Sequence, residues 1–224
     1  MNSAIIVAAG IGARFGSKTP KQFIQLNGKP LIIHTLQRFD DCPEINEIIL
    51  VLSSKETSGF LKLAKVYPFK KLSKIVSGGA TRSESVLKGF QAIRHQTSEI
   101  VVIHDGARPL VSIDEISQTV AKAQETGAAC LVGSVTDTIK KVQNGEIIET
   151  IDRNILRRAL TPQAFHYKIL KRAFDENEIN DNATDECYLV EKLGVKIATV
   201  EGSSQNIKIT TADDLVIAKA FLNY

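Results

Sequence analysis

Residues 4–22 read AIIVAAGIGARFGSKTPKQ. The apolar run at 4–8 is typical of a buried strand, and the glycine-rich residues 9–16 follow it directly. Backbone N–H groups in such a turn can approach a phosphate closely, because glycine carries no Cβ. Two cations, Arg14 and Lys21, lie in and just after the turn. The segment therefore predicts a site for a polyphosphate whose charge is neutralised during a reaction.

The spacing of the glycines excludes two familiar phosphate-binding motifs. A dinucleotide fingerprint reads G-x-G-x-x-G, whereas Gly10, Gly12 and Gly16 read G-x-G-x-x-x-G. A P-loop needs four residues between its glycines and then Gly-Lys-Ser/Thr, which the order Ser17-Lys18 does not match. For the glycines alone, an ordinary strand-to-loop turn with exposed basic residues remains an open alternative.

The composition is ordinary for a globular protein. The chain has 224 residues, 43% of them hydrophobic, and a net charge of +3. This length suits a single α/β domain covering residues 1–224. Nucleic-acid binding usually calls for a strongly basic face. We therefore expect no nucleic-acid partner, while a local basic pocket for an anionic small molecule stays compatible with the charge.

The cysteines and the apolar runs bear on location. Cys42, Cys130 and Cys187 are odd in number and far apart, so no disulfide framework is expected and a reducing cytoplasm fits. No apolar run approaches transmembrane length, and Met1 leads into the first strand without a signal or transit peptide. We expect a cytoplasmic protein with no membrane partner.

Short apolar strands alternate with helical patterns along the chain. The expected strands are Ala4–Ala8, Glu47–Leu52, Lys74–Val76, Ile100–His104 and Ala128–Val132, and the expected helices are Leu31–Phe39, Ser83–Arg94 and Ile113–Gln124. Ser112 and Thr211 are candidate helix N-caps. The alternation predicts a Rossmann-like α/β domain, with a mainly parallel sheet flanked by helices on both faces. Ligands bind outside the carboxyl ends of such strands, so the glycine turn and residues 104–109 should converge.

One segment breaks the alternation. Thr138–Gln143 and Glu146–Ile151 flank Asn144-Gly145, a strong hairpin signal because both turn positions tolerate positive φ. An isolated hairpin is marginal in water. This one is rich in charge, with little apolar surface to bury against the main sheet. We expect an arm of about residues 136–154 that packs against a second copy of the chain.

Two later segments follow strand ends and carry candidate site residues. In residues 78–85 (GGATRSES), glycines precede hydroxyls that can bind a nucleobase or ribose, or Ser83 merely caps a helix. In residues 104–109 (HDGARP), Asp105 could hold Mg²⁺ or a substrate hydroxyl, or pair with Arg108. The Arg108 guanidinium suits a phosphate. His104 is expected to be structural, because no nucleophile is spaced to it.

Five motifs, in order from Ala4 to Ala218, resemble one family. The first loop reads Ala8-Ala9-Gly10-x-Gly12-x-Arg14-x-Gly16 and then Pro20-Lys21-Gln22, similar to the signature of sugar-phosphate nucleotidyltransferases. Its Lys-Gln ending resembles the cytidylyltransferase branch, and specifically the 2-C-methyl-D-erythritol 4-phosphate cytidylyltransferase family of the non-mevalonate isoprenoid pathway. The resemblance departs at Ala80, where the family pattern often has an acidic residue.

The resemblance implies an enzyme that transfers CMP from CTP to 2-C-methyl-D-erythritol 4-phosphate and releases pyrophosphate, with Mg²⁺ on the triphosphate. It also implies a homodimer held by the hairpin arm. Two alternatives stay open. One is a ribitol or ribulose 5-phosphate cytidylyltransferase of teichoic acid synthesis, which typically has Ala-Val in place of Gly106-Ala107. The other is a non-catalytic nucleotide-binding module, which should have lost the cations.

The same resemblance assigns roles to single residues. It implies that Arg14, Lys21 and Lys208 stabilise the α-phosphate and the leaving pyrophosphate, with Lys208 on a short alternating strand. The implied nucleotide contacts are Ala8, Ala9, Gly10, Gly12, Gly79, Ser85 and Asp105. The implied acceptor contacts are Asp105, Arg108 and Thr138, together with Arg153 and Thr161 acting in trans. Asp105 is a candidate Mg²⁺ ligand, and Thr184-Asp185-Glu186 reads as a helix cap.

Overall fold

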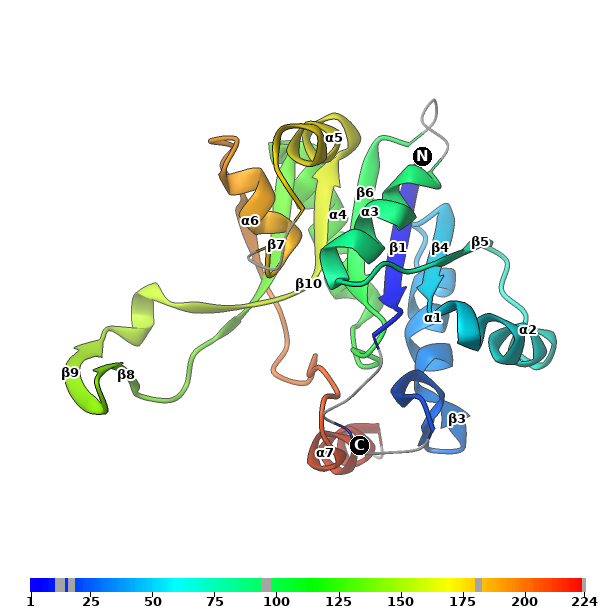
Figure 1. Cartoon of the computed structure of the whole chain (residues 1–224), viewed down its shortest axis with the longest axis horizontal. Coiled ribbons are helices and arrows are strands. Elements are labelled where there is room, and N and C mark those ends of the chain that lie inside the picture. Colours follow the sequence, from blue (N-terminus) through cyan, green and yellow to red (C-terminus); the bar gives the residue numbers. More distant parts are fainter. Residues whose placement is uncertain (11–14, 16–18, 94–97, 180–182, 223–224) are drawn as a thin grey trace.

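The structure is a computed structural model of the chain, and it describes residues 1–10, 15, 19–93, 98–179 and 183–222. A seven-stranded sheet forms its centre (Figure 1). In spatial order its strands are β11 (Ala198–Glu201), β7 (Ala128–Ser134), β10 (Arg157–His166), β6 (Ile100–Asp105), β1 (Asn2–Ala8), β4 (Glu47–Leu52) and β5 (Leu72–Ser77). Strand β10 runs antiparallel to β6 and β7, and the other pairs are parallel. The mainly parallel sheet is thus confirmed.

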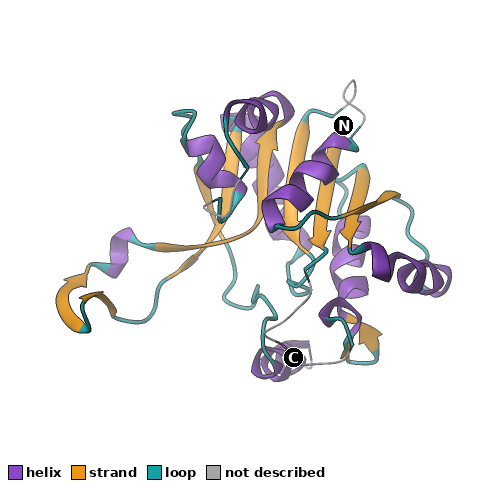
Figure 2. Cartoon of the chain, viewed as in Figure 1, coloured by secondary structure: helices purple, strands orange, loops and turns teal. Residues whose placement is uncertain are grey.

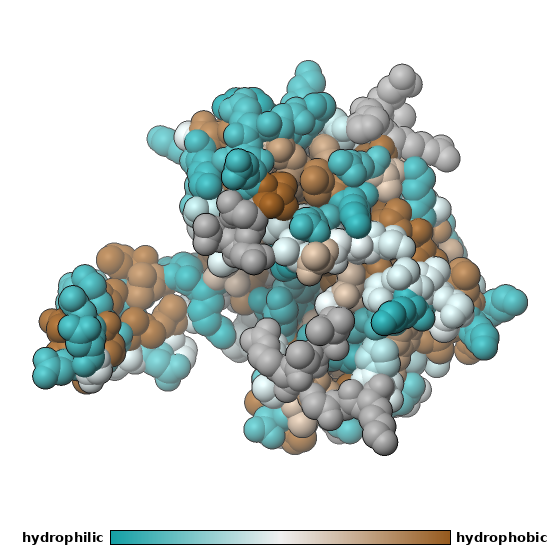
Figure 3. Space-filling model, in the orientation of Figure 1, coloured by the Kyte–Doolittle hydropathy of each residue, from teal (hydrophilic) through white to brown (hydrophobic). Residues whose placement is uncertain are grey.

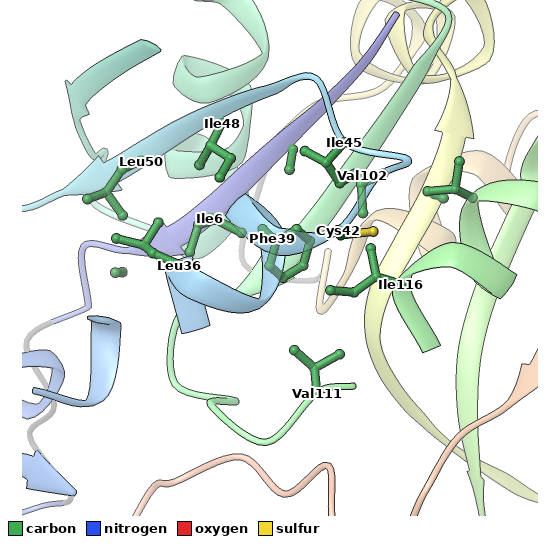
Figure 4. Packing of buried hydrophobic residues seen from close by; sticks show 14 of the residues in the cluster. Ile6, Leu36, Phe39, Cys42, Ile45, Ile48, Leu50, Val102, Val111 and Ile116 are labelled. Atoms are coloured by element: carbon green, nitrogen blue, oxygen red, sulfur yellow. The ribbon is translucent and has the colours of Figure 1, made fainter. Parts of the chain in front are cut away.

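Helices cover both faces of this sheet (Figure 2). On one face pack α1 (Leu31–Asp41), α2 (Thr57–Val66) and α4 (Ile113–Thr126); on the other pack α3 (Arg82–Gln91), α5 (Tyr167–Glu176) and α6 (Glu186–Glu191). Side chains of a strand alternate between faces, so Ile6 packs in the first layer, shown in Figure 4, and Ile5 in the second. Because both faces are covered, β4 and β6 are buried at every residue.

The small elements extend this frame at its edges. They are the 3₁₀ turns η2 (Lys21–Phe23), η3 (Ser54–Glu56) and η4 (Arg153–Ile155), the short hairpin of β2 (Gln25–Leu26) and β3 (Lys29–Pro30), and the last helix α7 (Ala212–Leu222). Helix α7 packs through Ala218 on Leu26 and Leu31. Ile209 belongs to the same cluster. This satellite core fixes the segment that carries Lys208, because its neighbours Ile207 and Ile209 pack in it.

Two local predictions were wrong. The N-cap of α3 is Thr81, whose hydroxyl accepts the Glu84 N–H at 3.1 Å, and not Ser83. Ser83 lies inside the first turn and donates to the Ala183 carbonyl at 2.8 Å. Lys208 lies in an irregular segment and not on a strand, because the chain there packs against the 104–109 turn through Ile209 N–H and Ala107 O at 2.8 Å.

The helix cap at Ser112 is confirmed. Its hydroxyl accepts the Glu115 N–H at 3.1 Å, and the Glu115 carboxylate accepts the Ser112 N–H at 2.8 Å, which completes a capping box. At α7, Thr211 accepts the Asp214 N–H at 3.4 Å.

The predicted hairpin is present as β8 (Ile139–Gln143) and β9 (Glu146–Ile151), and it projects away from the main sheet (Figure 1). Asn144 and Gly145 have φ of 51° and 85°, as a two-residue hairpin turn requires. Apolar side chains are visible on its surface (Figure 3), and Ile147 is 65% exposed. Val142 and Ile148, on the same hairpin, are 57% and 49% exposed.

Candidate active site

A cavity of about 760 Å³ lies at the carboxyl ends of β1, β5 and β6. Its walls include the predicted nucleotide residues Ala8, Ala9, Gly10, Gly79, Ser85 and Asp105 and the predicted catalytic residues Lys21 and Lys208. Segments far apart in the sequence are thus brought to one crevice. Gly12 and Arg14 lie outside the described residues.

The turns around the cavity pack too closely for a Cβ at Gly78, Gly79 and Gly106. A Cβ on Gly78 would stand 2.3 Å from the Cβ of Ala9, and one on Gly106 would stand 2.9 Å from the Cβ of Ala8. The turns after β5 and β6 therefore rest directly on the end of β1, which explains why three loops can share one ligand site.

Ser85 holds the shape of the turn after β5. Its hydroxyl donates to the Thr81 carbonyl at 2.9 Å and accepts the Gly79 N–H at 3.0 Å. The side chain is 2% exposed. Ser85 thus sets the backbone that faces the cavity at Gly79, in addition to lining the cavity itself.

Gln22 anchors the segment that carries Lys21. Its side-chain amide donates to the Ala8 carbonyl at 2.9 Å and to the Glu56 carboxylate, and Gln22 is 3% exposed. Burial raises the pKa of Glu56, and the Gln22 hydrogen bond counteracts that effect. The two residues of the Lys-Gln pair thus have different roles: Gln22 fixes the backbone, and Lys21 faces the cavity.

Asp105, at the end of β6, lies within a ring of cations. Its Oδ1 accepts Arg82 Nε at 3.0 Å, and its Oδ2 lies 2.9 Å from Lys208 Nζ and 3.4 Å from Arg108 Nε. Burial alone would raise the pKa of Asp105, but the charges of Arg82, Lys208 and Arg108 hold that pKa well below its usual range. The predicted pair with Arg108 exists, although it is the longest of the three contacts.

These contacts make Asp105 a poor metal ligand. Both carboxylate oxygens face cations, so a Mg²⁺ ion there would meet three positive charges at short range. Within the described ranges, no group of three or more His, Cys, Asp or Glu side chains could hold a metal ion. The residues present do not fit the predicted role of Asp105 as a Mg²⁺ ligand, because the arrangement neutralises the carboxylate already.

His104 is structural, as predicted, and its hydrogen bonds form a chain with Thr161. The Asp105 N–H donates to Thr161 Oγ1 at 3.1 Å, and the Thr161 hydroxyl donates to His104 Nδ1 at 3.0 Å. The other ring nitrogen, Nε2, donates to the Arg108 carbonyl at 3.1 Å. All the donors and acceptors in these hydrogen bonds are paired only when the His104 imidazole is neutral.

These hydrogen bonds correct the prediction that Thr161 acts in trans. Thr161 is 4% exposed and bonded to His104 and Asp105 of its own subunit, where the register between β10 and β7 shifts between Ala159 and Gln163. The hydroxyl is therefore part of the site of its own chain. Thr138 and Arg153 lie instead on the exposed arm.

Lowering the pH is expected to destabilise the fold through His104. Burial lowers the pKa of His104 to about 4, compared with about 6.5 in an unfolded chain. Between these values the unfolded state binds a proton that the folded state does not. Stability is therefore complete above about pH 6.5 and is lost as the pH falls toward 4, by about 3 kcal/mol from this group. Urea unfolding at pH 7 and pH 4.5 measures the loss.

The matched control is His104→Gln, which cannot gain this proton. Burial also lowers the pKa of His34, and that effect is common to both proteins, so their difference isolates His104. Equal losses of stability in wild type and His104→Gln would contradict the assignment.

A second cavity of about 190 Å³ adjoins the first. Arg82, Asp105 and Lys208 line both cavities, while Arg108 and Thr161 line the smaller one. Arg82 is the residue that the sequence analysis missed, although it lies within the quoted 78–85 motif. No local signal distinguishes its guanidinium from a solvated helix residue, because its partners Asp105 and Glu186 lie 23 and 104 residues further along the chain.

The whole chain is similar to known proteins of one family. A family model described as 2-C-methyl-D-erythritol 4-phosphate cytidylyltransferase matches residues 2–224. The chain belongs to this family. The 2-C-methyl-D-erythritol 4-phosphate cytidylyltransferase of Bacillus licheniformis is 45% identical, over 99% of this chain and 96% of its own length. The protein of the same name from Alkaliphilus oremlandii is 43% identical, over 98% of this chain and 94% of its own length.

A solved structure extends the likeness to the fold. The crystal structure of 4-diphosphocytidyl-2C-methyl-D-erythritol synthase from Anaerococcus prevotii superposes with a TM-score of 0.87 at 30% identity, covering 100% of this chain and 96% of that one. Membership of the family confirms the predicted enzyme class, a nucleotidyltransferase of the cytidylyltransferase kind. The ribitol or ribulose 5-phosphate alternative is not favoured. In the described part of the chain, no helix combines the length and apolarity needed to cross a membrane.

Proposed function

We propose that the protein transfers the cytidylyl group of CTP to 2-C-methyl-D-erythritol 4-phosphate and releases pyrophosphate, as a step of isoprenoid precursor synthesis. The observation that carries this function is the junction of two cavities at Asp105, Arg82 and Lys208. The larger cavity, of about 760 Å³, has the size of a nucleotide site. The smaller one offers Arg108 to a short phosphate-bearing acceptor.

Catalysis in this scheme rests on positioning and charge. The attacking group is a phosphate oxygen that is ionised at neutral pH, so the reaction needs no general base. Lys21 and Lys208 stabilise the charge that develops on the α-phosphate and the leaving pyrophosphate, and we assign Arg14 the same role. The backbone at Ala8, Ala9, Gly10, Gly12 and Gly79 binds the nucleotide, with Ser85 supporting the last of these turns.

The acceptor lies in the smaller cavity. Arg108 binds its phosphate, and Thr161 keeps the Asp105 backbone in place beside it. Asp105 acts as the anchor of the surrounding cations and not as a metal ligand. If Mg²⁺ takes part, the oxygens of the triphosphate and water supply its coordination, as is usual for this ion, and none of the steps assigned to these residues depends on it.

The arm is proposed to complete the site of a second copy of the chain. Its exposed apolar residues, Val142, Ile147, Ile148 and Ile155, support burial against another subunit. Among the described residues, those lining the two cavities do not include Thr138 or Arg153. Both therefore need a partner subunit to reach an acceptor, and we propose a homodimer in which they do so.

The free Cys42, Cys130 and Cys187 are compatible with a cytoplasmic location, which stays a prediction.

Pyrophosphate release tests the reaction directly. The assay supplies CTP and Mg²⁺ with 2-C-methyl-D-erythritol 4-phosphate, and in parallel with ribitol or ribulose 5-phosphate. We expect turnover with the first acceptor alone. Turnover on a pentose or pentitol phosphate would move the protein to the alternative acceptor class. CTP binding without turnover on any acceptor would favour a non-catalytic module and overturn the mechanism.

Arg153→Ala is expected to raise the KM for the acceptor by about tenfold or more, since a hydrogen bond to a charged group contributes about 1.5–3 kcal/mol. The KM for CTP should change little, because Arg153 is assigned to the acceptor and not to the nucleotide. Steady-state kinetics with each substrate varied in turn measure the two constants. Lys140→Ala, which removes another exposed cation of the arm, is the matched control.

Mixing two impaired variants, at an acceptor concentration near the wild-type KM, tests whether Arg153 acts in trans. In a dimer of one Lys21→Ala and one Arg153→Ala subunit, one of the two sites has both residues intact if the arm is exchanged. Partial activity should then return. If Arg153 served its own subunit, both sites would stay defective and the activity of the mixture would not exceed the average of its two components.

A further inference from the structure

The ion ring around Asp105 continues to a carboxylate that has no assigned role. Glu186, at the start of α6, is fully buried, and both of its carboxylate oxygens accept Arg82 Nη1, at 2.8 and 2.9 Å. The same guanidinium donates through Nε to Asp105 Oδ1 at 3.0 Å. Arg82 thus links α6, α3 and the end of β6 with one rigid group.

Because these charges are buried, each is costly in free energy unless it is paired with an opposite charge. Burial alone would lower the pKa of Arg82, but the charges of Glu186 and Asp105 outweigh that effect and raise it. A carboxylate buried without its cation costs several kcal/mol. The two charges therefore require each other, and the orientation of the guanidinium is set by Glu186 on one side.

The orientation of Arg82 has a consequence at Lys208. With Nε of Arg82 on Oδ1, the Asp105 carboxylate presents Oδ2 to Lys208 Nζ at 2.9 Å and to Arg108 Nε at 3.4 Å. The Lys208 side chain is 38% exposed and lines both cavities. Its ammonium is thus held at the junction of the cavities by a carboxylate that Arg82 holds in turn.

We propose that Glu186 and Arg82 are positioning residues, which hold Asp105 so that it keeps the Lys208 ammonium at the junction of the two cavities. Glu186 has no exposed surface, so it acts through Arg82. Without the charge of Glu186, the guanidinium loses the partner that sets its orientation, and the Asp105 carboxylate loses the contact that turns Oδ2 toward Lys208. The contribution to turnover rests on the proposed function, whereas the position of Lys208 does not.

Amine labelling of the intact protein tests the position of Lys208 without any substrate. Wild type and Glu186→Gln are treated briefly with acetic anhydride, and the modification of each lysine is read by mass spectrometry. In Glu186→Gln we expect Lys208 to react about threefold faster or more, because a partly exposed ion pair that is weakened no longer shields the amine. Surface lysines such as Lys122 should react as before. Unchanged labelling of Lys208 would overturn the proposal.

Glu115→Gln is the matched control, because Glu115 is another buried glutamate, 7% exposed, that lies outside both cavities. If Glu186→Gln fails to fold, the double variant Arg82→Met with Glu186→Leu replaces the whole ion pair by apolar side chains, a change that is often neutral for stability. It should show the same rise at Lys208. Equal rises in Glu115→Gln would reduce Glu186 to a general stabilising role and overturn the proposal.

Turnover supplies a second readout. Glu186→Gln should lower kcat about tenfold, while the Kd for CTP measured by calorimetry changes little. In an Asp105→Asn background, Glu186→Gln should cost less than about twofold in kcat, because residues that act through one another are not additive. Additive losses would show that Glu186 acts independently of Asp105. An inactive wild type would contradict the proposed function, and the labelling result would still decide the role of Glu186.

Discussion

Lys21→Ala is expected to lower kcat by about 10²–10³-fold and to leave the fold intact, because removing one preorganised charge donor costs about that much. Lys21 lines the nucleotide cavity, and its backbone is held by the buried neighbour Gln22 through Ala8 O at 2.9 Å. In the proposed function this cation faces the triphosphate, from a backbone that Gln22 fixes. Steady-state pyrophosphate release measures kcat, and far-ultraviolet circular dichroism with thermal unfolding confirms the fold.

A matched control keeps this prediction specific. Lys122 lies on α4, where it pairs with Glu125 on the surface, and Lys122→Ala should retain wild-type kcat. A Lys21→Ala enzyme with more than about a tenth of the wild-type kcat would contradict a transition-state role. A rise in the KM for CTP at constant kcat would instead indicate that Lys21 contributes equally to ground-state binding.

Lys208→Met is expected to lower kcat by about 10²-fold, for the same electrostatic reason. Lys208 lies at the junction of the two cavities. Methionine keeps most of the length of the side chain and removes the charge. The Asp105 carboxylate keeps Arg82 at 3.0 Å and Arg108 at 3.4 Å, so the buried anion stays compensated and the protein should fold. Single-turnover kinetics with CTP bound in advance separate the chemical step from binding.

Lys208→Arg is the informative companion of this variant. It restores a positive charge, but a planar fork replaces a compact ammonium between two cavities. We expect partial recovery of kcat over Lys208→Met. If Lys208→Met kept full kcat, the positive charge at the junction would be unnecessary and the assignment of Lys208 would be wrong.

Much of the fold could be predicted from the sequence because its signals are local. Glu47–Leu52 was predicted with the bounds that β4 has, since both faces of that strand are buried and the run is continuously apolar. The Asn144-Gly145 turn was predictable because two positive φ values are needed there. The antiparallel strand β10 was not predicted, because it carries Thr161-Pro162-Gln163 in its middle and pairs with strands far away in the chain.

The site residues divide in the same way. Lys21 and Gly79 lie in motifs whose residue types already indicate phosphate or nucleotide binding, and both line the cavity. Thr161 was placed in the wrong subunit, because its burial beside His104 follows only from the register of β10. Ser83 is a candidate cap from its residue type, but the N-cap of α3 is Thr81 and the helix begins at Arg82.

Strand burial, turn chemistry and motif spacing act over a few residues, so the family, the parallel sheet, the hairpin arm and the cations Lys21, Arg108 and Lys208 can be predicted without a structure. Which charges meet depends on how the folded chain packs. This packing places Arg82 between Asp105 and Glu186, residues separated from it by 23 and 104 positions. Coulomb energy depends on the distance in space and on burial, and neither can be obtained from separation along the chain.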